Sequence, residues 1–98
     1  MIEHILKVAP KSAKVVFEND KIRVIEIAMR KGQKLTMHSH MPNLTYGITN
    51  SRLRTTSPDG KSGVVRMKKG EASWSDGSSH SVENLGGLSL ILSIELKG

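Results

Sequence analysis

The feature that most constrains the fold is a succession of short apolar runs separated by residues that favour turns. Asn19-Asp20, Asn50-Ser51 and Pro58-Asp59-Gly60 divide the chain between Lys14 and Leu96 into such runs. No run shows a helical period beyond about two turns, except at most Ile2 to Val8. Many short strands without helices predict an all-β barrel or sandwich.

Two of these runs alternate as expected for strands inside a layered structure. In "KIRVIEIAMRKG", which starts at Lys21, both faces of the predicted strand are largely apolar, and "LSLILSIEL" near the C-terminus alternates in the same way. A chain of 98 residues holds one core and not two. We therefore expect a single domain over residues 1–98.

The composition narrows the cellular and chemical setting. The chain has no cysteine, which excludes disulfides and thiolate metal sites. Glu3, His4 and Lys7 interrupt the N-terminal apolar residues, so no signal peptide is expected. No run approaches the roughly 20 apolar residues of a membrane span. These features predict a cytoplasmic protein without a membrane partner.

The net charge of +6 does not indicate a nucleic-acid binder. The basic residues are spread along the chain, and only Phe17, Tyr46 and Trp74 are aromatic, whereas nucleic-acid surfaces combine basic stripes with aromatic residues. We expect no nucleic-acid partner and a preference for anionic small molecules.

Three of the four histidines fall into two clusters. His38 and His40 are two residues apart, so on a strand both imidazoles point to one side. His80 follows a Ser-Asp-Gly turn in a later strand. Three neutral imidazoles can hold a transition metal and leave open positions. The alternative for the first pair alone is two exposed histidines at a strand end.

The two clusters resemble the two motifs of the cupin superfamily. "GQKLTMHSH" has Gly32, five residues and then His38-x-His40, and "SDGSSHSVEN" follows the second motif from Ser75 to Asn84 with a Ser in place of its usual Pro. Twenty-nine residues separate His40 from Gly70, where the second motif region starts. The resemblance implies a cupin double-stranded β-helix, or jelly-roll barrel. It also implies a metal site of His38, His40 and His80 for iron, nickel, zinc, manganese or copper.

One departure from the cupin pattern is the missing Glu that usually follows the His-x-His pair. Either Leu44 or Thr45 stands in its place, and the onward spacing favours Leu44. That register predicts that Leu44, Tyr46 and Ile48 point into the barrel. Tyr46 then becomes a candidate catalytic acid or substrate ligand, with a core tyrosine as the equal alternative. Without the Glu, the site favours anionic ligands more strongly.

The resemblance implies a small metal-dependent enzyme. Three-His cupins include oxygenases, and we expect oxygenase-like or isomerase/lyase-like chemistry on a small anionic or carbonyl compound. The chain is also similar to short cupins associated with beta-alanine degradation, through "FEND", "HSH", "PDG" and "VEN". The alternative is a non-catalytic cupin that binds a metal or ligand as a sensor.

The remaining predictions concern surfaces. Exposed edge strands predict a homodimer, with the C-terminal strand and Phe17 at the interface. Trp74 is expected in packing or at that interface, and His4 on the surface. Asn84 is expected to have a structural role. Arg52 and Arg54, on either side of Leu53, are expected to point away from the barrel.

Overall fold

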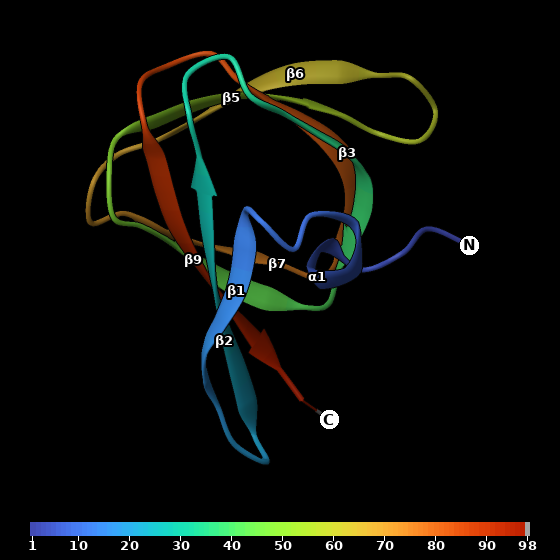
Figure 1. Cartoon of the computed structure of the whole chain (residues 1–98), viewed down its shortest axis with the longest axis vertical. Coiled ribbons are helices and arrows are strands. Elements are labelled where there is room, and N and C mark those ends of the chain that lie inside the picture. Colours follow the sequence, from blue (N-terminus) through green and yellow to red (C-terminus); the bar gives the residue numbers. More distant parts are fainter. Residues whose placement is uncertain (98) are drawn as a thin grey trace.

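The computed structural model describes residues 1–97, and nearly all of its regular structure is strand (Figure 1). Its one helix is a single turn and lies between Ile2 and Val8, the stretch whose apolar spacing allowed a helix. No helix among these residues is long and apolar enough to cross a membrane. The elements are α1 (Ile5–Val8), β1 (Ala13–Glu18), β2 (Ile22–Met29), β3 (Lys34–His40), β4 (Asn43–Gly47), β5 (Ser51–Thr56), β6 (Ser62–Met67), β7 (Ala72–Ser75), β8 (Ser78–Asn84) and β9 (Ser89–Leu96).

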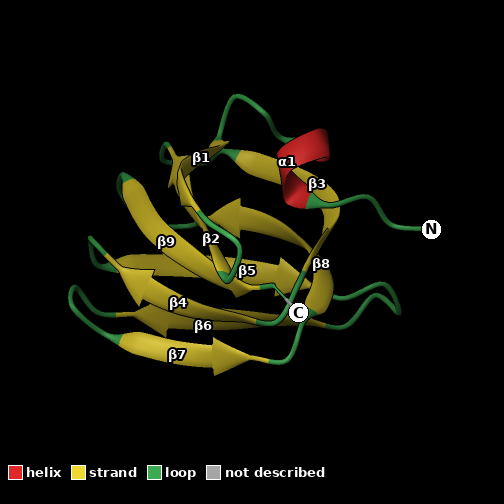
Figure 2. Cartoon of the chain, turned by 90° about the horizontal axis from the view of Figure 1, so that it is seen from below, coloured by secondary structure: helices red, strands yellow, loops and turns green. Residues whose placement is uncertain are grey.

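The strands form two antiparallel sheets that close around an interior, which confirms the predicted all-β jelly-roll class (Figure 2). One sheet has five strands in the order β1-β2-β9-β4-β7, and the other has four in the order β3-β8-β5-β6. Consecutive strands therefore often lie in opposite sheets, as Greek-key connections require.

The C-terminal strand β9 lies in the middle of the five-stranded sheet. It pairs with β2 along one edge and with β4 along the other. Both rows of its backbone groups are used within the chain, so β9 has no free edge for pairing with a second chain. Its outward side chains nevertheless stay partly exposed.

The hydrophobic core occupies the end of the barrel beneath α1. Ile5 of α1 packs there with Ile25 and Met29 of β2, and both Ile5 and Ile25 are almost fully buried. The other buried members come from β1, β3 and β8: Ala13, Leu35 and Val82.

Asn84 at the end of β8 has the structural role expected for it. Its side-chain amide donates to the carbonyl oxygens of Met29, Arg30 and Gly87 at 2.8 to 3.1 Å, and its Oδ1 accepts from the N–H of Gly86. The residue is 1% exposed, so it serves the backbone turns that follow β2 and β8.

Candidate metal centre

Adjacent strands bring the three predicted ligands together. His38 and His40 lie on β3, and His80 on β8 is the register partner of His38. Side chains directly opposite each other on antiparallel strands are close neighbours. The three ring centroids are 4.9 to 5.0 Å apart, and the candidate ligand atoms all lie within 4.8 Å of one another.

A glycine turn places the start of β8 against the end of β3. Gly77 has a φ of 105°, a backbone conformation that residues other than glycine rarely adopt. A Cβ at this position would lie 3.2 Å from the carbonyl oxygen of His40 and 3.5 Å from the nitrogen of Pro42. The glycine of the second motif therefore has a steric reason: it lets the turn approach the His-x-His pair closely.

The hydrogen bond of His38 determines which of its ring nitrogens faces the cluster. Its Nδ1 lies 2.7 Å from the carbonyl oxygen of Thr36, which can only accept, so Nδ1 carries the proton and donates. The Nε2 is then an unprotonated acceptor, and it is buried without a hydrogen-bond partner. Orphaned buried acceptors are costly, and a bound cation would satisfy this one. The three side chains thus fit a transition metal.

All three imidazoles are held in the neutral form that metal binding needs. Burial, together with the neighbouring His80 and His38, lowers the pKa of His40 to about 3. Burial and His38 lower the pKa of His80 to about 4, and burial also lowers the pKa of His38. Ligands that are already unprotonated release no protons when a metal binds.

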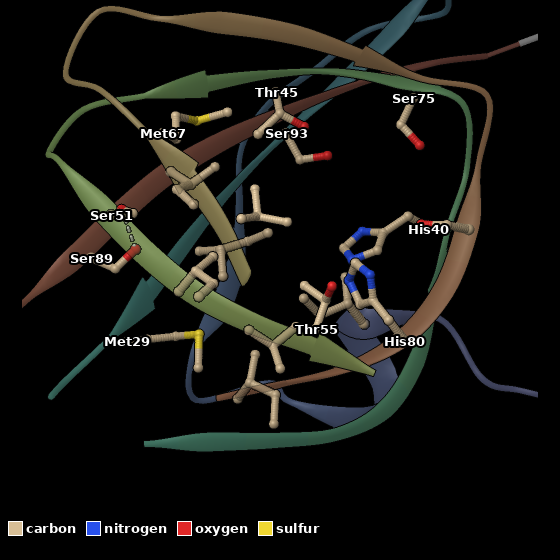
Figure 3. Close-up of a pocket in the computed structure, with 18 of the residues that line it drawn as sticks. Met29, His40, Thr45, Ser51, Thr55, Met67, Ser75, His80, Ser89 and Ser93 are labelled. Carbon is tan, nitrogen blue, oxygen red and sulfur yellow. Dashed lines mark hydrogen bonds between the residues drawn. The ribbon is translucent and has the colours of Figure 1, made fainter. Parts of the chain in front are cut away.

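The histidines open onto a cavity of about 280 Å³ inside the barrel (Figure 3). Its walls mix aliphatic side chains with many hydroxyl groups, and within residues 1–97 no Asp, Glu, Lys or Arg lines it. A metal would therefore be the main charge that a ligand meets there. The hydroxyl-bearing lining residues are Thr45, Ser51, Thr55, Ser73, Ser75, Ser78, Ser89 and Ser93.

The predicted register of β4 is wrong by one residue. Thr45 and Asn43 line the cavity, whereas Leu44 and Tyr46 are 39% and 40% exposed on the outer side. The polar side chains are stable inside because Asn43 donates to the carbonyl oxygen of Met41 and accepts from Thr45. Tyr46 is not part of the cavity wall, so its proposed catalytic role loses its geometric basis.

Of the two positions at which the motif can carry its Glu, Thr45 therefore faces the cavity and Leu44 does not. The outward prediction for Arg52 and Arg54 is confirmed: both are exposed, and Leu53 between them lines the cavity. Trp74 is 52% exposed, which excludes a core position for it.

A buried charge cluster beside the histidines was missed from the sequence. Glu95 of β9 is fully buried and accepts from both Nε and Nη2 of Arg23 at 2.9 and 2.7 Å. His4 accepts from the N–H of Leu6 through Nδ1, so its Nε2 donates to Glu95 at 2.6 Å. The expectation of a surface role for His4 is therefore wrong.

This cluster ties the N-terminal segment to the strand that carries two of the ligands. The His4 ring lies 6.5 Å from the His40 ring, and the N–H of Ser39 donates to the carbonyl oxygen of Glu3. Burial raises the pKa of Glu95, but hydrogen bonds from His4 and Arg23 outweigh it, and the pKa falls. In the alternation of β9, Glu95 shares a face with Ser89 and Ser93, so hydrophobicity alone would place it outside, and the cluster has no signal in the sequence.

Comparison with known proteins rests on structure. No family model and no curated protein matches the sequence. A cupin domain from Bordetella pertussis Tohama I superposes with a TM-score of 0.80 at 24% identity, over 88% of this chain and 92% of that one.

More distant structures agree with this similarity. An RmlC-like cupin with a double-stranded β-helix from Methanocaldococcus jannaschii gives a TM-score of 0.64 at 9% identity, covering 86% of this chain and 77% of that one. KdgF from Halomonas sp. gives 0.62 at 16% identity with the same two coverages, 86% and 77%. None of these structures bears on beta-alanine degradation. The chain therefore has the cupin fold, the double-stranded β-helix that its two motifs predicted.

Proposed function

We propose that the protein binds a divalent transition metal through His38, His40 and His80 and uses it to hold a small ligand in the cavity. The observation that carries this proposal is the buried, unpartnered Nε2 of His38 beside two other neutral imidazoles. An all-nitrogen ligand set suits iron, nickel, zinc, manganese or copper better than magnesium or calcium.

The charge of the site selects the end of the ligand that binds there. Three neutral imidazoles leave the full +2 charge of a divalent ion, which attracts a carboxylate or a carbonyl oxygen. The rest of the cavity offers hydroxyl, amide, thioether and aliphatic groups among the described residues. The ligand is therefore a small acid or carbonyl compound with an uncharged body.

Ser93 is the proposed contact for that body. Its hydroxyl is buried without a hydrogen-bond partner, although it lines the cavity. In Figure 3 it lies near Thr45, its register partner on β4. A polar group on the ligand would satisfy this hydroxyl, so we assign Ser93 to ligand recognition.

The chemistry proposed is that of a metal-dependent oxygenase or an isomerase or lyase. A bound metal supplies Lewis-acid polarisation and open coordination positions. The protein supplies three neutral imidazoles and a cavity wall of aliphatic and hydroxyl side chains. The second candidate, a non-catalytic sensor, is favoured by the lining itself, which within residues 1–97 offers no carboxylate, Lys or Tyr as an acid or base. A small-molecule partner and a cytoplasmic location belong to the same proposal.

Metal analysis of protein purified without a His tag tests the site. His80→Ala should lose metal at least about 10-fold more readily than the parent, whereas the matched control Ser79→Ala on the same strand should not. If His80→Ala kept the parent's metal content, the assignment of this ligand would be wrong.

Ligand titration of the metal-loaded protein then separates the two functions. A panel of small acids and carbonyl compounds is screened by calorimetry, and Ser93→Ala should weaken the ligands that bind. Turnover or O2 uptake with a bound compound supports the enzyme. Binding without turnover supports the sensor.

A further inference from the structure

Three hydroxyl groups of the cavity lie side by side across neighbouring strands of the five-stranded sheet. The register places Thr45 of β4 opposite Ser93 of β9 and also opposite Ser73 of β7. All three residues line the cavity, and residues directly opposite each other on antiparallel strands are close neighbours. Ser93 is 2% exposed, whereas Ser73 on the edge strand is exposed. The row therefore runs from the edge of the sheet to a buried hydroxyl.

The proton of the Thr45 hydroxyl is already in use, and the bonds of Asn43 show where. The side-chain amide of Asn43 donates through Nδ2 to the carbonyl oxygen of Met41 at 2.8 Å, and a carbonyl oxygen can only accept. The orientation of the amide is thereby fixed, with its Oδ1 toward Thr45. That oxygen also only accepts, so Thr45 donates to it at 2.9 Å. Thr45 therefore presents only lone pairs to the cavity.

Ser93, beside Thr45 in Figure 3, has the complementary property. Its buried hydroxyl has no hydrogen-bond partner among residues 1–97, so both its proton and its lone pairs are free. A ligand group that contacts both residues must donate to Thr45 and can accept from Ser93. A neutral hydroxyl does both. A carbonyl oxygen has no proton for Thr45, and a methylene group can neither donate nor accept.

We propose that the cavity selects a small hydroxy acid whose hydroxyl donates to Thr45 and accepts from Ser93. This inference rests on the function proposed above, in which the carboxylate of the ligand binds at the metal. An ammonium group could also donate to Thr45, but no Asp or Glu within residues 1–97 lines the cavity to offset its charge near a divalent ion. The cavity of about 280 Å³ is small for a ligand site, so the acid has a short carbon chain.

The other sheet gives the site a handedness. Leu53 of β5 and Val65 of β6 are register partners on the four-stranded sheet, and both line the cavity with aliphatic groups. The ligand thus meets three different surroundings: the histidines at its carboxylate, the hydroxyl row at one side and aliphatic side chains at another. A mirror-image ligand with its carboxylate in the same place turns its hydroxyl away from the row. One enantiomer of a chiral hydroxy acid is therefore preferred.

A series of matched acids tests the inference on the metal-loaded protein. Calorimetry compares the isomers and enantiomers of hydroxybutyrate with butyrate and with the matching oxobutyrates and aminobutyrates. One hydroxybutyrate enantiomer should bind about 10-fold or more tightly than butyrate and its oxo counterpart. Equal binding of all these acids would overturn the inference and leave the metal-dependent function standing. Tighter binding of an oxobutyrate or aminobutyrate would overturn it too, and binding of none would overturn both.

Variants of Thr45 assign the preference to its hydroxyl. Thr45→Val replaces that hydroxyl by a methyl group and should abolish the preference for hydroxybutyrate over butyrate, whereas Thr45→Ser should keep it. Thr56→Val makes the same change on the outer side of β5, where Thr56 is bonded to Ser62, and should keep the preference as well. Retention of the preference in Thr45→Val, or its loss in Thr45→Ser, would overturn the assignment.

Asn43→Ala tests the direction of the hydrogen bond without removing either proposed contact. Without Oδ1 of Asn43, the proton of Thr45 can turn to the cavity, and a carbonyl oxygen can then accept from it. Oxobutyrate should therefore bind more tightly to Asn43→Ala than to the parent, and the advantage of hydroxybutyrate over oxobutyrate should shrink. Circular dichroism establishes that the variant is folded. An unchanged order of the acids in folded Asn43→Ala would overturn the proposal.

Discussion

The inside of the barrel and the outer face of the five-stranded sheet differ in what their side chains still lack. Inside, Glu95 has its ion-pair partners, but the hydroxyl of Ser93 and the Nε2 of His38 have none. Outside, large apolar side chains are exposed to water, among them Phe17, Leu44 and Trp74. The free chain thus leaves unpartnered polar atoms in its interior and large exposed apolar side chains on its exterior.

The largest effect should come from the charged interior. Arg23→Ala would leave Glu95 buried with only His4 and the N–H of Met41 as partners, and breaking a buried pair in this way costs about 3 to 5 kcal/mol. Urea unfolding should therefore show a large loss of stability. The control is Arg54→Ala, whose exposed ion pair with Glu83 should contribute less than about 1 kcal/mol. Equal losses in the two variants would mean that the buried Arg23–Glu95 pair stabilises the fold no more than the exposed pair does.

Two neighbouring residues of β4 allow the two regions to be compared directly. Thr45→Glu places a carboxylate in the cavity, where without metal it should cost several kcal/mol or take up a proton. Adding metal should restore stability and improve metal retention. Leu44→Glu should show neither effect, because it changes the outer face only. Melting curves with and without metal decide this, and metal-dependent stability in Leu44→Glu would contradict the observed register.

Acid should destabilise the metal-free protein through the cavity histidines. The pKa values of His40 and His80 lie at about 3 and about 4, below the ordinary value of 6.5. Between these limits the unfolded chain binds protons that the folded chain does not, so stability present above pH 6.5 is lost as the pH falls. We expect a loss of about 2 kcal/mol between about pH 6.5 and pH 5. His80→Asn should have a shallower profile, and an unchanged slope would show that other groups dominate.

The smallest effect tests the unpartnered hydroxyl. Ser93→Ala removes a buried group that has no hydrogen bond, so the free protein should be stabilised by up to about 1 kcal/mol. The same change should weaken ligand binding, which separates recognition from folding. Ser51→Ala is the control, since it breaks a hydrogen bond with Ser89 and should lower stability. A destabilised Ser93→Ala would indicate that the hydroxyl has a partner in solution.

The sequence predicted the fold and the three-histidine cluster because both depend on short-range patterns. Alternation identifies strands, and an i, i+2 pair places His38 and His40 on one side whatever the rest of the chain does. Gly77 carries its own steric constraint. These signals do not depend on which face of a strand is the inner one.

The prediction that the apolar residues of β4 point inward was wrong, and the composition of that strand shows why. Leu44 and Tyr46 are the apolar residues of that strand, so a register chosen by hydrophobicity turns them inside. The actual interior is lined by Asn43 and Thr45, which are stabilised by hydrogen bonds to each other and to Met41. Contacts between distant segments, such as His4 with Glu95, leave no local pattern that sequence reasoning could detect.

The bond between His4 and Glu95 joins residues 91 positions apart, and this separation has a consequence for how the chain folds. The chain loses conformational entropy when so long a loop closes, before the contacts between its ends stabilise it. Folds dominated by such contacts therefore form slowly. During synthesis, the segment with His4 emerges before β9, so the contact with Glu95 forms only once β9 has been made. Strands β3 and β8, which carry the three histidines, can pair earlier, but the end of the barrel beside them closes only after β9 has been made. We therefore expect the barrel to be completed after translation of β9, with refolding limited by the joining of the two ends.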